Sequence, residues 1–103
     1  MQLSDYQKAA AFTAIYPQEH AILYPALGLA GEAGEVANKV KKMIRDGNTD
    51  LKAIAAELGD VLWYVAALAR DLGVDLDDLA NDNLNKLYDR KERGVLGGSG
   101  DKR

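Results

Sequence analysis

The chain has 103 residues, of which 48% are hydrophobic and 28% charged, and its net charge is −3. This length and composition are typical of a single globular domain and argue against disorder. The sequence contains no cysteine, which excludes disulfides, thiolate zinc sites and cysteine nucleophiles. A single histidine, His20, argues against imidazole-based metal sites and Ser-His-Asp catalysis.

Charge and hydropathy patterns argue against two classes of binding partner, membranes and nucleic acids. No apolar run approaches the roughly 20 residues that span a bilayer, and the first residues lack the pattern of a signal peptide. We therefore expect a cytoplasmic protein with no membrane partner. Residues 86–103 carry six basic and three acidic residues, whereas the rest of the chain is acidic. Because the basic charge is not spread over the chain, nucleic acid is not an expected partner.

The first half of the chain predicts two helices. The first is expected over about residues 4–16, with Ser4 or Asp5 as its N-cap and Pro17 after its end. A connection follows. The second helix is expected over about residues 25–45, because proline is favoured in the first turn of a helix.

The second half predicts two more helices. Residues 46–50 have turn composition, and the next helix is expected over about 51–72, with Gly73 as its stop. Asp75 is the expected N-cap of a last helix that runs to about Arg93. No stretch alternates with a period of two. We therefore predict an all-α protein, a four-helix bundle.

We expect this bundle to form one helical domain over residues 1–95. Residues 96–103 form a Gly-rich C-terminal segment that is either a flexible tail or a lid over a ligand.

A short acidic pattern occurs twice in the central part of the chain. Residues 31–36 and 56–61 share the order small, Glu, apolar, Gly, acid, Val. Each copy places two carboxylates three residues apart in a predicted helix, so both lie on one face. Two such pairs facing each other would form an oxygen-rich site for a hard divalent cation. The four acids are Glu32, Glu35, Glu57 and Asp60.

One acid of each pair falls on the apolar stripe of its helix. At about 100° per residue, Glu32 lies at the angle of Met43, and Glu57 lies between Tyr64 and Leu68. An unpartnered buried carboxylate is costly or takes up a proton. Since this occurs twice, a bound cation is the simplest explanation.

The same two copies each contain a glycine, Gly34 or Gly59, which costs about 1 kcal/mol in a helix interior. The recurrence of these glycines predicts either close approach of two helices or room for a ligand. For any single copy, a solvated acidic face with pairs such as Glu35 and Lys39 is the alternative. The pattern occurs twice, and each copy places one acid on the apolar face of its helix. These two facts favour a metal site over a solvated acidic face.

The ligand types narrow the choice of metal. Neither pair contains the histidine that di-iron bundles use. Carboxylates alone favour Mg²⁺, with Mn²⁺ as the alternative. Because Mg²⁺ commonly binds together with substrate phosphates, the implied chemistry is metal-assisted hydrolysis of a phosphoanhydride.

The order Glu32-x-x-Glu35, 21 intervening residues, Glu57-x-x-Asp60 resembles the signature of the MazG-like all-α nucleoside triphosphate pyrophosphohydrolases. Many members of that family carry a further Glu where this chain has Gly31, which leaves the details of coordination open.

The resemblance extends beyond the four acids, over about residues 20–100. It includes the stretches 28–36 and 57–64 and an Asn-x-x-Lys-Leu-x-x-Arg element at 83–90. It implies Mg²⁺-dependent hydrolysis of a nucleoside triphosphate to monophosphate and pyrophosphate, in a homodimer or tetramer with a role in nucleotide-pool housecleaning.

By this similarity Glu32, Glu35, Glu57 and Asp60 are the metal ligands and the catalytic residues. The metal would polarise phosphoryl oxygens and lower the pKa of a water that attacks phosphorus in line. Either Glu32 or Glu35 would also orient that water, and the sequence does not choose between them.

Four further residues are candidate substrate contacts. Asn83, Lys86 and Arg90 can face one ligand from successive helical turns and resemble phosphate contacts, although a solvated basic helix end is the alternative. Tyr64 resembles the base-contacting aromatics of related enzymes, and its alternative is core packing.

Three other side chains receive structural assignments. Lys39 and Lys42 follow the first acidic pair, and a solvated face is favoured over phosphate contact for both. Trp63 points away from Tyr64, which predicts packing in a subunit interface or against the first helix.

The sequence alone does not exclude several other functions. Within the same superfamily, the substrate could be phosphoribosyl-ATP, or a single nucleotide such as dUTP or dCTP. A non-catalytic helical module that binds metal or nucleotide is a hypothesis of another class. A purely structural oligomerisation protein would leave Glu32 and Glu57 unexplained.

Overall fold

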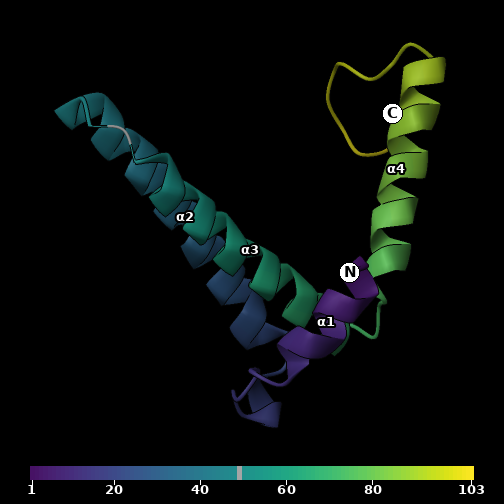
Figure 1. Ribbon diagram of the computed structural model, residues 1–103. Helices are drawn as coiled ribbons and strands as arrows, with labels where there is room; N and C mark the ends of the chain where they lie inside the picture. Colours follow the sequence, from purple (N-terminus) through teal and green to yellow (C-terminus); the bar gives the residue numbers. More distant parts are fainter. Residues whose placement is uncertain (49) are drawn as a thin grey trace.

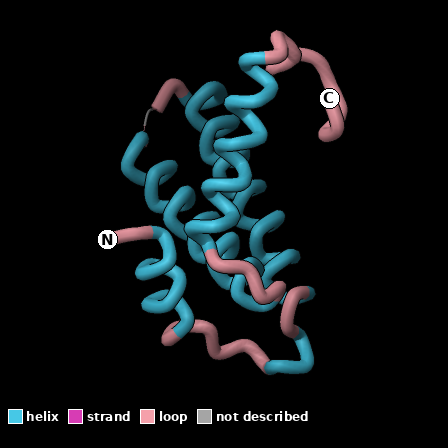
Figure 2. The backbone as a smooth tube through the Cα atoms, turned by 90° about the vertical axis from the view of Figure 1, so that its right-hand side faces the viewer, coloured by secondary structure: helices cyan, strands magenta, loops and turns pink. Residues whose placement is uncertain are grey.

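The computed structural model describes residues 1–48 and 50–103. All regular structure in these residues is helical (Figure 2), which confirms the predicted all-α class. The elements are the helices α1 (Leu3–Ala11), α2 (Leu23–Asp46), α3 (Leu51–Asp71) and α4 (Leu76–Glu92) and the short 3₁₀ helix η1 (Gln18–His20). Within the described residues, no helix combines the length and the apolar character needed to cross a membrane.

Aspartates cap the starts of α3 and α4, and Asp75 is the N-cap that the sequence predicted. Asp50 caps α3 by accepting the Ala53 N–H at 3.0 Å, and Asp75 caps α4 by accepting two N–H groups of its first turn. Gly73, with φ of 76°, adopts the left-handed conformation that ends a helix. Thr49, in the predicted turn at 46–50, lies outside the described residues.

The predicted N-cap of the first helix was wrong. Gln2 caps α1, and the Asp5 carboxylate accepts the Gln2 N–H at 3.0 Å, so Asp5 lies inside the first turn. The Ser4 hydroxyl instead donates to Asp75, which ties α1 to the start of α4.

The predicted end of this helix at residue 16 was also wrong, because α1 stops at Ala11. The Thr13 hydroxyl donates to the Ala10 carbonyl at 2.7 Å, a side-chain bond that competes with helical backbone pairing. Phe12 and Ile15 are exposed, so they contribute no packing that would extend the helix.

The helices form an open V rather than a closed cylinder. α2 and α3 make an antiparallel hairpin along their lengths, α1 packs at the junction, and α4 diverges from the hairpin (Figure 1). The Cα radius of gyration is 16.4 Å, compared with about 13 Å for a compact domain of 100 residues.

The buried core is small and lies where α1, α3 and α4 meet. Ala66, Ala69 and Leu76 form it, with Tyr6 and Val65 packed against them. This placement leaves most of the hairpin outside the core.

Gln7 joins the three elements that meet there. Its amide nitrogen donates to the carbonyl of Val74 at 3.0 Å, and its amide oxygen accepts the Leu76 N–H at 2.9 Å. The Gln7 side chain is buried, so these bonds give its amide the partners that a buried polar group needs.

The connection into α2 is held by Asp71. Its carboxylate accepts the Ile22 N–H at 2.9 Å and the Tyr16 hydroxyl at 2.7 Å. Burial alone would raise the pKa of Asp71, but these hydrogen bonds and the charge of Arg70 leave it lowered. Tyr16 then stacks on Tyr24 at a centroid distance of 4.7 Å, which begins an aromatic group at this end of the hairpin.

Candidate functional site

Three of the four predicted acids meet between α2 and α3. Glu32 projects from α2, and Glu57 and Asp60 project from α3. Each offers a carboxylate oxygen within 4.8 Å of the others. Glu32 and Glu57 are partly buried and Asp60 is exposed, as the positions relative to the apolar stripe predicted. These three residues are called the acidic cluster below.

The charges of the acidic cluster repel one another. A hydrogen bond shared with Glu57 is the largest cause that raises the pKa of Glu32, followed by desolvation and the charges of Glu57, Asp60 and Glu35. Converging oxygen ligands without nitrogen or sulfur suit a hard cation such as Mg²⁺, whose charge would remove this repulsion. The residues therefore fit the metal that the sequence predicted.

Glu35 is placed differently from the other three acids. It lies on the exposed surface of α2, one turn beyond Glu32, and is not among the residues whose oxygens converge. Its charge is still close enough to contribute to the raised pKa of Glu32. Glu35 thus borders the acidic cluster without belonging to it.

The glycines of the two acidic copies do not mark close helix approach. A Cβ built on Gly34 or Gly59 would meet no heavy atom within 4 Å, so that part of the prediction was wrong. The close approach occurs instead at Gly28, where a Cβ would overlap the ring of Tyr64. Only a glycine lets this ring lie against α2.

Aromatic residues line a cavity on one side of the acidic cluster. Its volume is about 360 Å³, and it is lined by Thr13, Glu32, Asp60, Trp63 and Tyr64. The Trp63 indole N–H donates to the Thr13 hydroxyl at 2.7 Å. Trp63 therefore packs on the segment that follows α1, close to the prediction, but it also lies at the site.

Sequence reasoning did not identify Trp63 or Thr13 as site residues. The helical wheel placed Trp63 away from Tyr64, and no motif marks Thr13. The sequence feature that could have identified Trp63 is its position beside Tyr64, one helical turn after Asp60.

Tyr64, the predicted substrate contact, lines the same cavity as Glu32 and Asp60. Its ring lies 6.4 Å from that of Tyr24 and 5.0 Å from that of Trp63. Burial is the largest cause that raises the pKa of Tyr64, and the charges of Glu32 and Asp60 raise it further. The phenol therefore stays neutral beside the acidic cluster.

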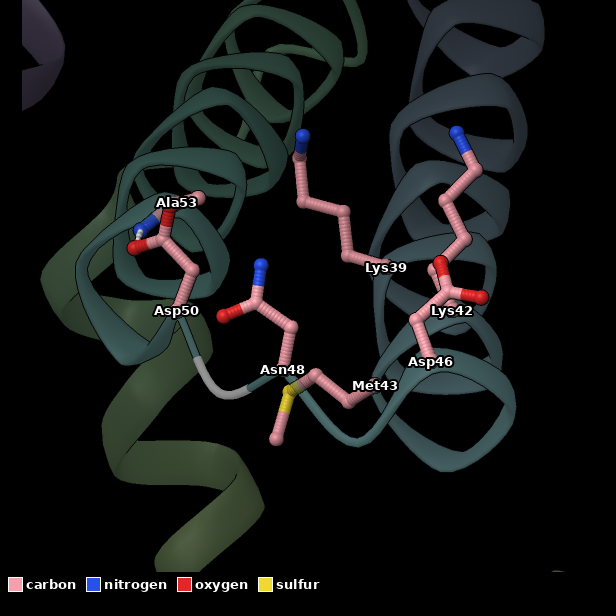
Figure 3. A pocket seen from close by; sticks show the side chains of 7 residues that line it. All are labelled: Lys39, Lys42, Met43, Asp46, Asn48, Asp50 and Ala53. Carbon is pink, nitrogen blue, oxygen red and sulfur yellow. Dashed lines mark hydrogen bonds between the residues drawn. The ribbon is translucent and has the colours of Figure 1, made fainter.

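Lys39 lies on the opposite side of the acidic cluster. Its Nζ is 3.8 Å from Glu57 Oε1, so the amine belongs to the site rather than to a purely solvated face. Lys39 and Lys42 also line a cavity of about 200 Å³ near the turn between α2 and α3 (Figure 3).

The predicted phosphate contacts of α4 are not brought to the acidic cluster within one chain. Asn83, Lys86 and Arg90 lie on the helix that diverges from the hairpin (Figure 1). Lys86 and Arg90 instead contact Asp101 of the C-terminal segment.

Comparison with known proteins supports the sequence resemblance. Residues 18–95 match the family model described as the MazG nucleotide pyrophosphohydrolase domain. The chain is also 49% identical to the Gene 37 protein of Mycobacterium phage L5, in an alignment of 114 positions that covers all of both proteins. No solved structure matches the chain.

Proposed function

The chain belongs to the MazG nucleotide pyrophosphohydrolase family, and from this membership we propose that it hydrolyses nucleoside triphosphates to monophosphates and pyrophosphate. The observation that carries the proposal is the convergence of Glu32, Glu57 and Asp60 within 4.8 Å. These oxygen ligands favour Mg²⁺ as the metal, with Mn²⁺ as a substitute. We assign this activity to a single helical domain formed by residues 1–95.

In the proposed reaction a water oxygen bonds to the α-phosphorus. The bond from that phosphorus to the oxygen bridging the β-phosphorus breaks, and its electron pair leaves with pyrophosphate. A bound Mg²⁺ supplies Lewis acidity and neutralises phosphate charge. Glu32, Glu57 and Asp60 hold the cation. Glu35 orients the water and accepts its proton, because it lies beside Glu32 but outside the three converging ligands.

The other substrate contacts are assigned by chemistry and position. Tyr64, which lines the aromatic cavity, takes the base. Asn83, Lys86 and Arg90 contact phosphates. Since α4 diverges from the hairpin of its own chain, these contacts require α4 of a second copy.

A homo-oligomer, a dimer or a tetramer, is therefore part of the proposal. It is supported by large apolar side chains on the hairpin, including Leu58, which is 55% exposed, and Ile44, which is 81% exposed. Val40 and Ile44 line an open apolar hollow on the outer face of α2. Apolar surface of this kind marks an interaction site.

Light scattering coupled to gel filtration tests the assembly. The wild-type chain should elute as a dimer or tetramer, and Ile44→Glu should shift it to a smaller species. Gln18→Glu, in the exposed helix η1, is the control and should not change the mass. A monomeric wild-type protein that hydrolyses nucleotides would contradict this part of the proposal.

The activity is tested by incubating the protein with nucleoside and deoxynucleoside triphosphates and Mg²⁺ in ¹⁸O-labelled water. Chromatography should detect monophosphate and pyrophosphate, with the label in the monophosphate, because water attacks the α-phosphorus. Label in the pyrophosphate, or release of orthophosphate, would overturn the mechanism. Glu57→Gln should abolish turnover, whereas Glu19→Gln, an exposed acid in η1, should not.

The same panel separates the alternative substrates and functions. Phosphoribosyl-ATP, dUTP and dCTP are included as individual substrates. Hydrolysis confined to one of them would identify a restricted enzyme. Nucleotide binding without turnover of any substrate would instead identify a non-catalytic helical module.

A further inference from the structure

The residues along the contact between α2 and α3 change in chemistry from one end of the hairpin to the other. The two helices are antiparallel, so three groups of residues follow one another along the hairpin. The aromatic cavity with Trp63 and Tyr64 lies toward α1, the acidic cluster lies in the middle, and Lys39 and Lys42 lie toward the connection between α2 and α3. The two ends differ in chemistry, one aromatic and one cationic.

Lys39 is the cation that reaches the acidic cluster. Its Cα lies seven residues from that of Glu32, or about 10 Å along α2. Its flexible side chain brings Nζ to 3.8 Å from Glu57 Oε1. With 34% of its side chain exposed, Lys39 is accessible to a ligand beside the acidic cluster.

Figure 3 shows that Lys39 and Lys42 both extend away from Asn48 and the turn. Two acids line the same cavity, but both have partners. Asp46 accepts two bonds from Arg45, at 2.7 and 2.9 Å, and Asp50 caps α3. Neither carboxylate contacts Lys39 or Lys42 in the described structure.

We propose that Lys39 holds the departing pyrophosphate, so that the substrate lies with its base toward Trp63 and its β- and γ-phosphates toward the connection between α2 and α3. This inference rests on the proposed pyrophosphohydrolase function. Cleavage places an electron pair on pyrophosphate, and a lysine ammonium fixed there stabilises that developing charge. A cation held by Glu57 would weaken the pairing of Glu57 with Lys39 and leave the ammonium for phosphate.

Two product fragments, inorganic pyrophosphate and nucleoside monophosphates, test the two ends separately. Binding of each is measured by titration calorimetry in Mg²⁺. Lys39→Gln should weaken pyrophosphate binding about tenfold or more, as expected for a lost charged hydrogen bond. It should change monophosphate binding less than about twofold. Lys39→Arg should restore most of the pyrophosphate affinity.

Lys8→Gln is the control variant. It removes the same charge from an exposed position on α1, outside the residues proposed to bind substrate or a second copy. It should leave both affinities unchanged. Circular dichroism on all three variants verifies that helix content is retained.

The single tryptophan supplies a second readout. Trp63 is the only tryptophan in the chain, so its fluorescence reports on the aromatic end. Monophosphates should quench it, whereas pyrophosphate should not. Equal quenching by both ligands, or unchanged pyrophosphate affinity in Lys39→Gln, would overturn the proposed direction.

These measurements use binding alone and need no turnover. If the wild-type protein hydrolyses no triphosphate, the proposed function fails in the activity assay. If it does hydrolyse triphosphates but Lys39→Gln weakens both fragments equally, the function stands and the assignment of Lys39 fails.

Discussion

Asp101 of the C-terminal segment pairs with Lys86 of α4. Its Oδ1 lies 3.0 Å from Lys86 Nζ and 3.2 Å from Arg90 Nη2, and its backbone carbonyl also accepts from Arg90. Arg103 donates to the carbonyls of Val95 and Gly97, so the segment folds back on itself beside α4 (Figure 1). Two residues proposed to contact phosphate thus hold a carboxylate of their own chain.

This pairing predicts the pH at which the segment detaches. Lys86, followed by Arg90, lowers the pKa of Asp101. A lowered pKa in the folded state means that the ion pairs are fully formed above the ordinary aspartate value of about 3.9 and are lost as the pH falls below it. The amide NMR shifts of Gly97, Gly98 and Gly100 should therefore stay constant from pH 7 down to about 4. They should move to random-coil values as the pH falls through the lowered pKa of Asp101.

At neutral pH, Asp101→Asn should release the segment in the same way. It should also tighten binding of inorganic tripolyphosphate to the metal-free protein about two- to fivefold, the size of an exposed ion pair. Asp89→Asn, which removes a carboxylate paired with Arg93 on the same helix, is the control. Weaker tripolyphosphate binding in Asp101→Asn would show that Asp101 orients the two cations rather than competing for them.

Divalent cations should stabilise the fold through the acidic cluster. At a Mn²⁺ concentration 100 times Kd, the gain is about 2.7 kcal/mol, or a rise in Tm on the order of 10 °C for a chain of this size. Scanning calorimetry should show this rise in wild type and none in Glu57→Gln.

Glu35→Gln separates the two roles assigned to the acids. Because Glu35 lies outside the converging ligands, this variant should keep most of the Mn²⁺-induced rise in Tm while losing turnover. Loss of the rise in Glu35→Gln would instead make Glu35 a metal ligand.

The contact between Gly28 and Tyr64 predicts opposite effects of the same substitution at two glycines. Gly28→Ala would place a Cβ on the Tyr64 ring and should destabilise the protein by about 1–3 kcal/mol. Gly31→Ala, with open space around its Cβ, should stabilise it by about 0.5–1 kcal/mol. Urea unfolding measures both, and a stabilising Gly28→Ala would contradict the packing described.

Gln7 should be essential for the junction of α1, α3 and α4. Gln7→Met keeps the side-chain length but leaves the buried Leu76 N–H without its partner, which costs about 1–3 kcal/mol. Urea unfolding should show a loss of this size. Gln18→Met, on the exposed helix η1, should change the free energy of unfolding by less than about 0.5 kcal/mol.

Several features could be predicted because they depend on near neighbours in the chain. The spacing of apolar residues determined the helices, and Asp50 and Asp75 determined where α3 and α4 begin. The three-residue spacing within each acidic pair placed its carboxylates on one face. Local periodicity also placed Glu32 and Glu57 at partly buried positions.

Other features depend on packing between residues distant in sequence, which no local pattern encodes. The crossing of α2 and α3 decided that Glu32, Glu57 and Asp60 converge while Glu35 stays outside. The close approach at Gly28 depends on where the Tyr64 ring lands on the neighbouring helix.

The acidic pattern alone thus predicted a cation site, because two acids on apolar stripes needed a partner. The tertiary structure decided how the rest of the site is arranged. It placed Lys39 of α2 beside the acidic cluster, and Lys86 and Arg90 of α4 against Asp101. The cations of the two helices differ in this way because α2 packs along α3 whereas α4 diverges from it, and this packing is not encoded in the sequence of either helix alone.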